Sequence, residues 1–154
     1  MDIKIESATL RLLDRLYEIE KQSFQKEAFS KQQIRYLLTD YNAISLIASI
    51  ENEVAGFVIG RLEVTRETSY GHIFTIETMP EYRRKGVAEK LLRELEKLFR
   101  EKGASESRLE VREDNLPAIN LYKKLGYKPM GRLEGYYGNA HGLYLKKNLT
   151  QSED

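Results

Sequence analysis

Apolar positions near the start of the chain change from an alternating to a helical spacing. Ile3 and Ile5 alternate with polar residues, as in a short strand. From Thr9 onward the spacing is helical, and the apolar residues of this predicted helix are Leu10, Leu13, Leu16 and Tyr17. Ser30 is a residue type that caps helices, so a second helix is expected after it.

The middle of the chain has the pattern of strands. Segments 45–50 and 54–64 are apolar and flank the polar turn 51–53, which predicts a hairpin. Segment 70–78 alternates again and is followed by Pro80, which cannot donate to a sheet. We therefore expect three strands in this region.

Helices and strands alternate in the second half. Apolar residues in 87–99 recur about every 3.6 positions, and Gly103 is placed to end that helix. A strand follows, and then a helix capped by Asn115 whose packed face is expected to carry Leu116, Ile119, Tyr122 and Leu125. The last two strands are expected at 128–133 and 143–149. This order predicts an α/β fold with a mixed, mostly antiparallel central sheet flanked by helices.

Length and composition narrow the class of protein. The chain of 154 residues is 41% hydrophobic and 32% charged, which fits one soluble domain over 1–150 and a frayed tail at 151–154. A net charge of +1 predicts no general attraction to nucleic acid or anionic membrane. Without cysteine, and with His72 and His141 as the two histidines, no metal site is expected. No long apolar stretch or signal sequence is present, so we expect a cytoplasmic protein.

The segment richest in candidate chemistry is 80–88, which lies between a predicted strand and a strong predicted helix. Backbone N–H groups at a helix start form an anion site, and Gly86 would let a phosphate approach them closely. Arg83, Arg84 and Lys85 add positive charge. An ordinary basic loop is the alternative on these residues alone. The spacing fits neither a Walker loop nor a dinucleotide fingerprint.

Two motifs in order resemble the GNAT superfamily of N-acetyltransferases. Arg83-x-x-Gly86-x-Ala88 is similar to the superfamily's Q/R-x-x-G-x-G/A motif. Downstream, segment 109–127 resembles the RimI-type N-terminal protein acetyltransferases, and the resemblance extends over about 3–149. It implies a GNAT fold, acetyl-CoA as co-substrate, no metal, and transfer of an acetyl group to a protein N-terminus.

The resemblance also implies which residues bind acetyl-CoA. The backbone of one strand would contact the pantetheine arm and the acetyl carbonyl, through Ile76, Glu77 and Thr78. The loop and helix start would bind the pyrophosphate, through Arg83, Arg84, Lys85, Gly86, Val87 and Ala88. Asn115 would make a further contact with CoA.

For catalysis the resemblance implies Glu110 as the general base, acting through water, and Tyr122 as the acid that protonates the CoA thiolate. A phenol with a pKa of about 10 keeps its proton at neutral pH, as an acid must. On the residues alone, Glu110 is equally a surface carboxylate paired with Arg112, and Tyr122 a packed aromatic residue. Glu77 stands where the family has a small or apolar residue, so it is either a further acid/base group or directed to the other face.

The implied acceptor is an α-amine. Its pKa of about 7.7–8.0, against about 10.4 for lysine, leaves far more of it uncharged at neutral pH, which suits a single carboxylate base. Tyr136 and Tyr137 resemble paired tyrosines that bind the substrate N-terminus, and Phe24 and Phe29 match the opposite wall. Where the family often has an acidic loop, this chain has Gly-Asn-Ala-His-Gly, and His141 is either a local acid/base or without a role.

Other functions fit the same sequence. A GNAT enzyme can acetylate a small amine, such as a polyamine or an amino acid, or a protein lysine. A CoA-binding regulatory module without turnover is the alternative outside enzymes, although the presence of both Glu110 and Tyr122 favours catalysis. A ribosomal protein is one candidate acceptor, and a monomer or weak homodimer is expected.

Overall fold

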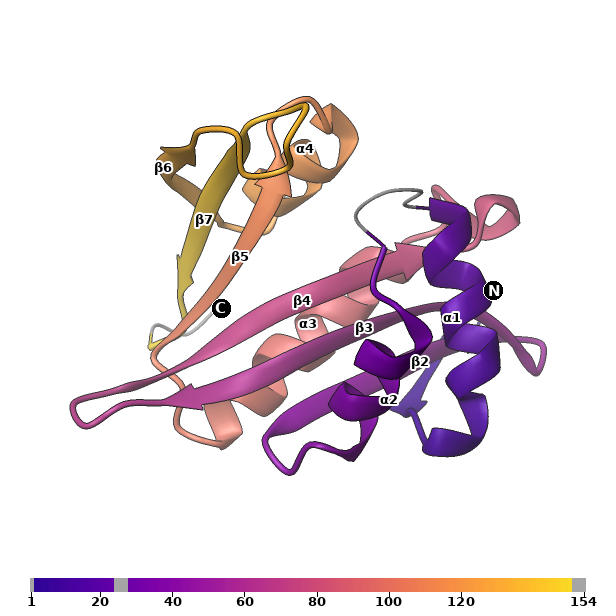
Figure 1. Ribbon diagram of the computed structural model, residues 1–154. Helices are drawn as coiled ribbons and strands as arrows, with labels where there is room; N and C mark the ends of the chain where they lie inside the picture. Colours follow the sequence, from indigo (N-terminus) through magenta and orange to yellow (C-terminus); the bar gives the residue numbers. More distant parts are fainter. Residues whose placement is uncertain (1, 24–27, 151–154) are drawn as a thin grey trace. The chain divides into compact units, whose positions relative to one another are not determined.

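The computed structural model describes residues 2–23 and 28–150 (Figure 1). Its helices and strands follow in the order β1 (Lys4–Ser7), α1 (Leu13–Ser23), α2 (Lys31–Thr39), β2 (Ala43–Ile50), β3 (Glu53–Val64), β4 (Ser69–Thr78), α3 (Val87–Glu101), β5 (Glu106–Arg112), α4 (Leu116–Lys124), β6 (Lys128–Leu133) and β7 (Gly142–Asn148). Short 3-10 helices occupy Leu10–Leu12 and Pro80–Tyr82. No helix in the described ranges is long and apolar enough to cross a membrane.

The strands form a mixed sheet in the order β1-β2-β3-β4-β5-β7-β6. β1 with β2, β2 with β3, β5 with β7 and β6 with β7 pair antiparallel. β4 and β5 pair in parallel, which requires a long crossover, and α3 lies in that crossover. The predicted α/β class, with a mostly antiparallel sheet and flanking helices, is confirmed.

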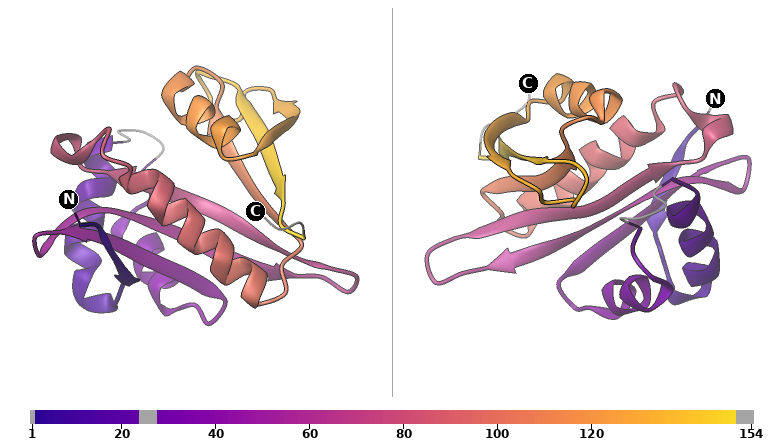
Figure 2. Two further views of the ribbon diagram at one scale, coloured as in Figure 1. Left: turned by 180° about the vertical axis from the view of Figure 1, so that it is seen from behind. Right: turned by 45° about the horizontal axis from the view of Figure 1, so that its top comes forward.

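The chain divides into two compact units. Unit 1 comprises residues 1–61 and 75–95, and unit 2 comprises 62–74 and 96–154. Within unit 1, α1 and α2 lie on one face of the strands and the first part of α3 lies on the other (Figures 1 and 2). The fully buried side chains of unit 1 include Leu16, Ile19, Ile34, Phe57, Ile59, Leu91 and Leu92.

Local signals in unit 1 act as the sequence predicts. The Ser30 hydroxyl accepts from the Gln33 N–H at 3.1 Å, and the Gln33 side chain accepts from the Ser30 N–H at 2.8 Å, a complete capping box. The predicted hairpin turns at Glu51 and Asn52, whose φ angles of 51° and 70° match a type I′ turn.

Two details of the predicted helices are wrong. The first helix begins only at Leu13, because residues 10–12 form a 3-10 turn that leaves Leu10 44% exposed. Leu116 was expected on the packed face of its helix, but it is the first residue of α4 and is 62% exposed. Ile119 and Tyr122 do pack, as predicted.

Unit 2 is built around a buried carboxylate. Glu96 on α3 is 1% exposed and accepts hydrogen bonds from Lys147 Nζ at 2.7 Å and from the Tyr127 hydroxyl at 2.8 Å. Since the Tyr127 proton goes to Glu96, the Ser107 hydroxyl, 2.8 Å away, donates to Tyr127. Burial and the charge of Glu96 raise the pKa of Tyr127 well above its usual value, so Tyr127 stays a neutral donor.

Close packing in unit 2 requires a glycine on β4. Gly71 pairs with Ser107 of β5, and a Cβ on Gly71 would lie 2.2 Å from ring atoms of Phe99. Phe99 is fully buried, so its ring has little room to move.

Gly71→Ala should lower the free energy of unfolding by about 1–3 kcal/mol, because the added methyl group overpacks the core against Phe99. Gly131→Ala is the control, since Gly131 lies on β6 and an added Cβ meets no atom within 4 Å. Its effect should stay within about 0.5 kcal/mol. Urea unfolding measures both, and equal losses in the two variants would contradict the packing argument.

Lys147→Met should lower the free energy of unfolding by about 3–5 kcal/mol, because it leaves the Glu96 carboxylate buried without a cation. The double variant Glu96→Met, Lys147→Met should recover most of that loss, since it removes both charges. Chemical denaturation of the two variants and the wild type tests this. If Lys147→Met were as stable as the wild type, the buried Glu96 carboxylate would not need the charge of Lys147.

Candidate functional site

The loop before α3, residues 83–86, belongs to unit 1 and has a strained backbone. Arg84 and Gly86 have left-handed φ angles of 63° and 83°. The Lys90 N–H donates to the Gly86 carbonyl at 3.0 Å, so Gly86 occupies the N-cap position of α3. The N–H groups of a first helical turn have no partner within the helix and carry partial positive charge. The predicted helix start is confirmed.

The same loop has cations available for a ligand. Arg83, Arg84 and Lys85 are exposed, and among the described residues their side chains form no ion pair or hydrogen bond. A Cβ on Gly86 would meet nothing within 4 Å, so glycine is needed here for its positive φ and for access to the backbone. The positive charges of these three side chains and the backbone N–H groups at the start of α3 fit a pyrophosphate.

The predicted contact strand, Ile76 to Thr78, lies at the end of β4 in unit 1. Ile76 and Thr78 are half-buried, whereas Glu77 is 6% exposed. The Glu77 carboxylate lies 3.3 Å from the Thr75 hydroxyl. A Cβ on Gly56 of β3 would come within 2.5 Å of the Glu77 carbonyl oxygen, so β3 and β4 approach closely here.

In unit 2, Glu110 is hydrogen-bonded to His72, for which the sequence predicts no role. Glu110 Oε1 lies 2.8 Å from His72 Nε2, and the two side chains are 23% and 24% exposed. The parallel register pairs His72 with Arg108, two residues from Glu110 on the same face of β5. Arg112, the alternative partner of Glu110, forms an ion pair with Asp114 at 3.0 Å.

Tyr122 and Asn115 both lie on α4. Tyr122 is 6% exposed, and its ring meets Tyr127 edge-on with centroids 5.7 Å apart. The Asn115 side chain accepts from the Ala118 N–H at 3.3 Å, so the predicted N-cap is confirmed. The contact of Asn115 with CoA and the acid role of Tyr122 stay predictions.

The predicted tyrosine pair lies in the loop between β6 and β7. The rings of Tyr136 and Tyr137 meet edge-on, with centroids 4.9 Å apart, and Tyr136 is 55% exposed. Partial burial and the negative charge of Glu110 raise the pKa of Tyr136, so Tyr136 lies within the field of the predicted base. His141 Nδ1 accepts from the Gly135 N–H at 2.9 Å, which closes the loop.

The other predicted acceptor wall is described in part. Phe29 is half-buried, directly before the N-cap of α2, and its N–H donates to Glu20 at 3.1 Å. Phe24 lies outside the described residues.

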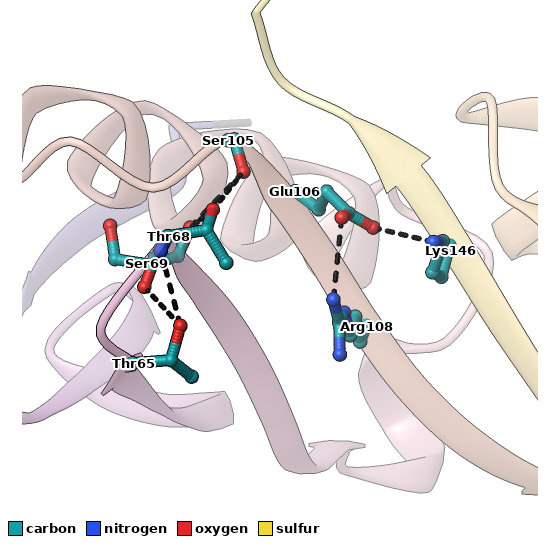
Figure 3. Close-up of polar contacts among 7 residues, drawn as sticks. All are labelled: Thr65, Thr68, Ser69, Ser105, Glu106, Arg108 and Lys146. Atoms are coloured by element: carbon teal, nitrogen blue, oxygen red, sulfur yellow. Dashed lines mark hydrogen bonds and ion pairs between the residues drawn. The ribbon is translucent and has the colours of Figure 1, made fainter.

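None of the predicted residues lines the pocket found on unit 2. Its volume is about 430 Å³, and its lining residues are Ser105, Glu106, Lys128, Met130, Lys146, Asn148 and Thr150. Glu106 pairs with Lys146 at 2.9 Å and with Arg108 at 3.3 Å (Figure 3). The charges of Glu106, Arg108 and Lys146 are therefore paired with one another, and we assign the pocket no ligand. In the ranges that the structure covers, no cluster of His, Asp and Glu could hold a metal.

A family model decides the class of protein. Residues 13–127 match the acetyltransferase (GNAT) family. The chain belongs to that family. The predicted superfamily and its acetyl-CoA-dependent acetyltransferase activity are thereby confirmed.

Two relatives agree with the RimI-type resemblance. An N-alpha-acetyltransferase of Sulfurisphaera tokodaii is 37% identical over 117 residues, 70% of each chain. A Bacillus subtilis protein, named as a candidate [ribosomal protein bS18]-alanine N-acetyltransferase, is 34% identical over 133 residues, 86% of this chain and 85% of its own. The crystal structure of Ard1 from Thermoplasma volcanium shares the GNAT fold, with a TM-score of 0.88 at 23% identity over 98% of this chain and 100% of that one.

Proposed function

We propose that this GNAT enzyme transfers the acetyl group of acetyl-CoA to the N-terminal α-amine of proteins. The observation that carries the proposal is Glu110, a partly buried carboxylate held by His72 with Tyr136 inside its field. A carboxylate whose charge acts on an exposed tyrosine, Tyr136, suits a peptide that must present an uncharged amine. The names of the two relatives support the same acceptor.

The catalytic roles are assigned to groups of unit 2. Glu110 accepts a proton from the amine through water, and His72 positions its carboxylate. The amine nitrogen then bonds to the thioester carbonyl carbon and the carbon–sulfur bond breaks. Tyr122 gives its hydroxyl proton to the departing thiolate, which needs a phenol that is protonated at neutral pH.

We assign the donor to groups of unit 1, and the family resemblance implies Asn115 as a further contact with CoA. The backbone and cations from Arg83 to Ala88 bind the pyrophosphate, and the backbone from Ile76 to Thr78 binds the pantetheine arm and the acetyl carbonyl. Acetyl-CoA supplies the activated acetyl group when bound.

Ribosomal and other newly made proteins are the proposed acceptors, in line with the Bacillus subtilis relative. Because newly made proteins are the proposed acceptors, we propose that the enzyme acts in the cytoplasm. We propose that it acts as a monomer or weak homodimer.

The proposal is tested by thiol release from acetyl-CoA with three kinds of acceptor: peptides with free N-termini, N-blocked lysine peptides and polyamines. We expect turnover with free N-termini alone. Turnover with polyamines or blocked lysine peptides would show that the acceptor is one of those amines and not a protein N-terminus. CoA binding without any turnover would favour a regulatory module.

Tyr122→Phe should lower kcat by about 100-fold or more, because the ring stays while the proton donor is lost. Binding of acetyl-CoA, measured by calorimetry, should change less than about 2-fold, since the phenol is assigned to proton transfer and not to binding. Unchanged turnover in this variant would remove Tyr122 from the reaction.

Gly86→Glu should abolish CoA binding, because it places bulk and negative charge at the proposed pyrophosphate site. Gly103→Glu is a matched control at the other end of α3: its φ is 91°, and its added Cβ also meets nothing within 4 Å. Both variants place a side chain at a positive φ angle. Comparing their CoA titrations therefore separates the effect of backbone strain from the effect of bulk and charge at the pyrophosphate site. Normal CoA binding by Gly86→Glu, or an equal loss in both, would refute the role of the loop.

A further inference from the structure

A buried carboxylate in unit 1 joins α1 to β4 and to the segment before α2. Glu20 lies on α1 and is 1% exposed. The Thr75 hydroxyl on β4 donates to its Oε1 at 2.6 Å, and the Phe29 N–H, just before α2, donates to its Oε2 at 3.1 Å. Each carboxylate oxygen therefore has a donor, and the donors come from two separate segments.

The two donors fix parts of the chain with different proposed tasks. Phe29 is assigned to the acceptor wall, and Thr75 directly precedes Ile76, which begins the strand assigned to the acetyl group and pantetheine arm. Glu20 sets the distance between the start of α2 and this strand within unit 1. A displacement of the Phe29 backbone would move the acceptor wall while leaving the donor strand in place.

Both hydrogen bonds favour the ionised form of Glu20. Burial raises the pKa of Glu20 above its usual value, and the hydrogen bonds from Thr75 and Phe29 oppose that rise. The Glu77 carboxylate also lies 3.3 Å from the Thr75 hydroxyl. A hydroxyl group has one hydrogen to donate, and Glu20 is the nearer acceptor. The Thr75 hydroxyl therefore donates to Glu20 and not to Glu77.

We infer that Glu20 is a positioning residue for the acceptor: through Thr75 and Phe29 it holds the start of α2 against β4 and thereby sets the affinity for the peptide. The inference rests on the proposed function. It assigns no chemical step to Glu20, which acts through the segment that it anchors.

Thr75→Val tests the inference, because valine keeps the shape of threonine and removes the donated hydrogen bond. We expect the KM for an N-terminal peptide to rise about 10-fold, since loss of a hydrogen bond to a charged group commonly changes affinity by that order. The KM for acetyl-CoA should change less than about 2-fold, and Thr75→Ser, which restores the hydroxyl, should return the peptide KM toward the wild-type value.

Ile50→Val is the control for stability alone. Ile50 is buried at the end of β2 in unit 1, and no substrate contact or catalytic role is proposed for it. Loss of one buried methyl group should lower the stability by about 0.5–1.5 kcal/mol and leave the peptide KM unchanged. A peptide KM that is unchanged in Thr75→Val, or that rises equally in Ile50→Val, would overturn the positioning role.

Hydrogen exchange separates failure of this inference from failure of the proposed function. If the wild type acetylates other amines and no peptide, the proposed acceptor is wrong whatever the variants do. The anchor itself is then judged by the Phe29 amide, which should exchange about 10-fold faster in Glu20→Gln than in the wild type, because the charge-assisted bond is lost. Equal exchange rates would show that Glu20 does not hold this segment.

Discussion

The hydrogen-bond network around the buried Glu96 carboxylate is the feature on which unit 2 depends. It takes one hydrogen bond from β7 through Lys147 and one from Tyr127, which in turn is bonded to β5 through Ser107. Three elements of unit 2 therefore converge on one side chain of α3. Glu110 stands three residues beyond Ser107 on β5, and Tyr122 packs against Tyr127, so the proposed base and acid both rest on this network.

Unit 1 contains a buried carboxylate used in a similar way. Glu20 collects one side-chain donor and one backbone donor, as Glu96 collects Lys147 and Tyr127. In both units an acidic side chain on a helix fixes segments that come from distant parts of the sequence. A buried carboxylate with two donors is costly to disturb, because removal of either donor leaves part of a charge without compensation. Such residues suit the task of holding a site in a defined geometry.

Much of the fold could be predicted because its signals are local. The N-cap at Ser30, the turn at Glu51 and Asn52 and the apolar stripe of α3 each depend on a few neighbouring residues. Leu10 and Leu116 were placed wrongly because both stand at helix ends, where spacing alone does not say which residue first faces the core. The GNAT resemblance itself came from motifs with short spacing.

The site was predicted less completely because its pairings depend on register. His72 and Glu110 meet only through the parallel alignment of β4 with β5, across the whole length of α3, and no local pattern specifies that alignment. Glu20 and Thr75 lie even farther apart in sequence, and the alternation of β4 shows only that Thr75 faces inward. These contacts belong to the tertiary structure, so the sequence alone does not reveal them.

The central claim is that the acetyl group is placed on an α-amine. The most direct measurement uses one peptide with a free N-terminus and an internal lysine, incubated with the enzyme and acetyl-CoA, and locates the acetyl group by tandem mass spectrometry. We predict a single product acetylated at the N-terminal nitrogen. Acetylation of the lysine side chain, with the N-terminus left free, would contradict the account.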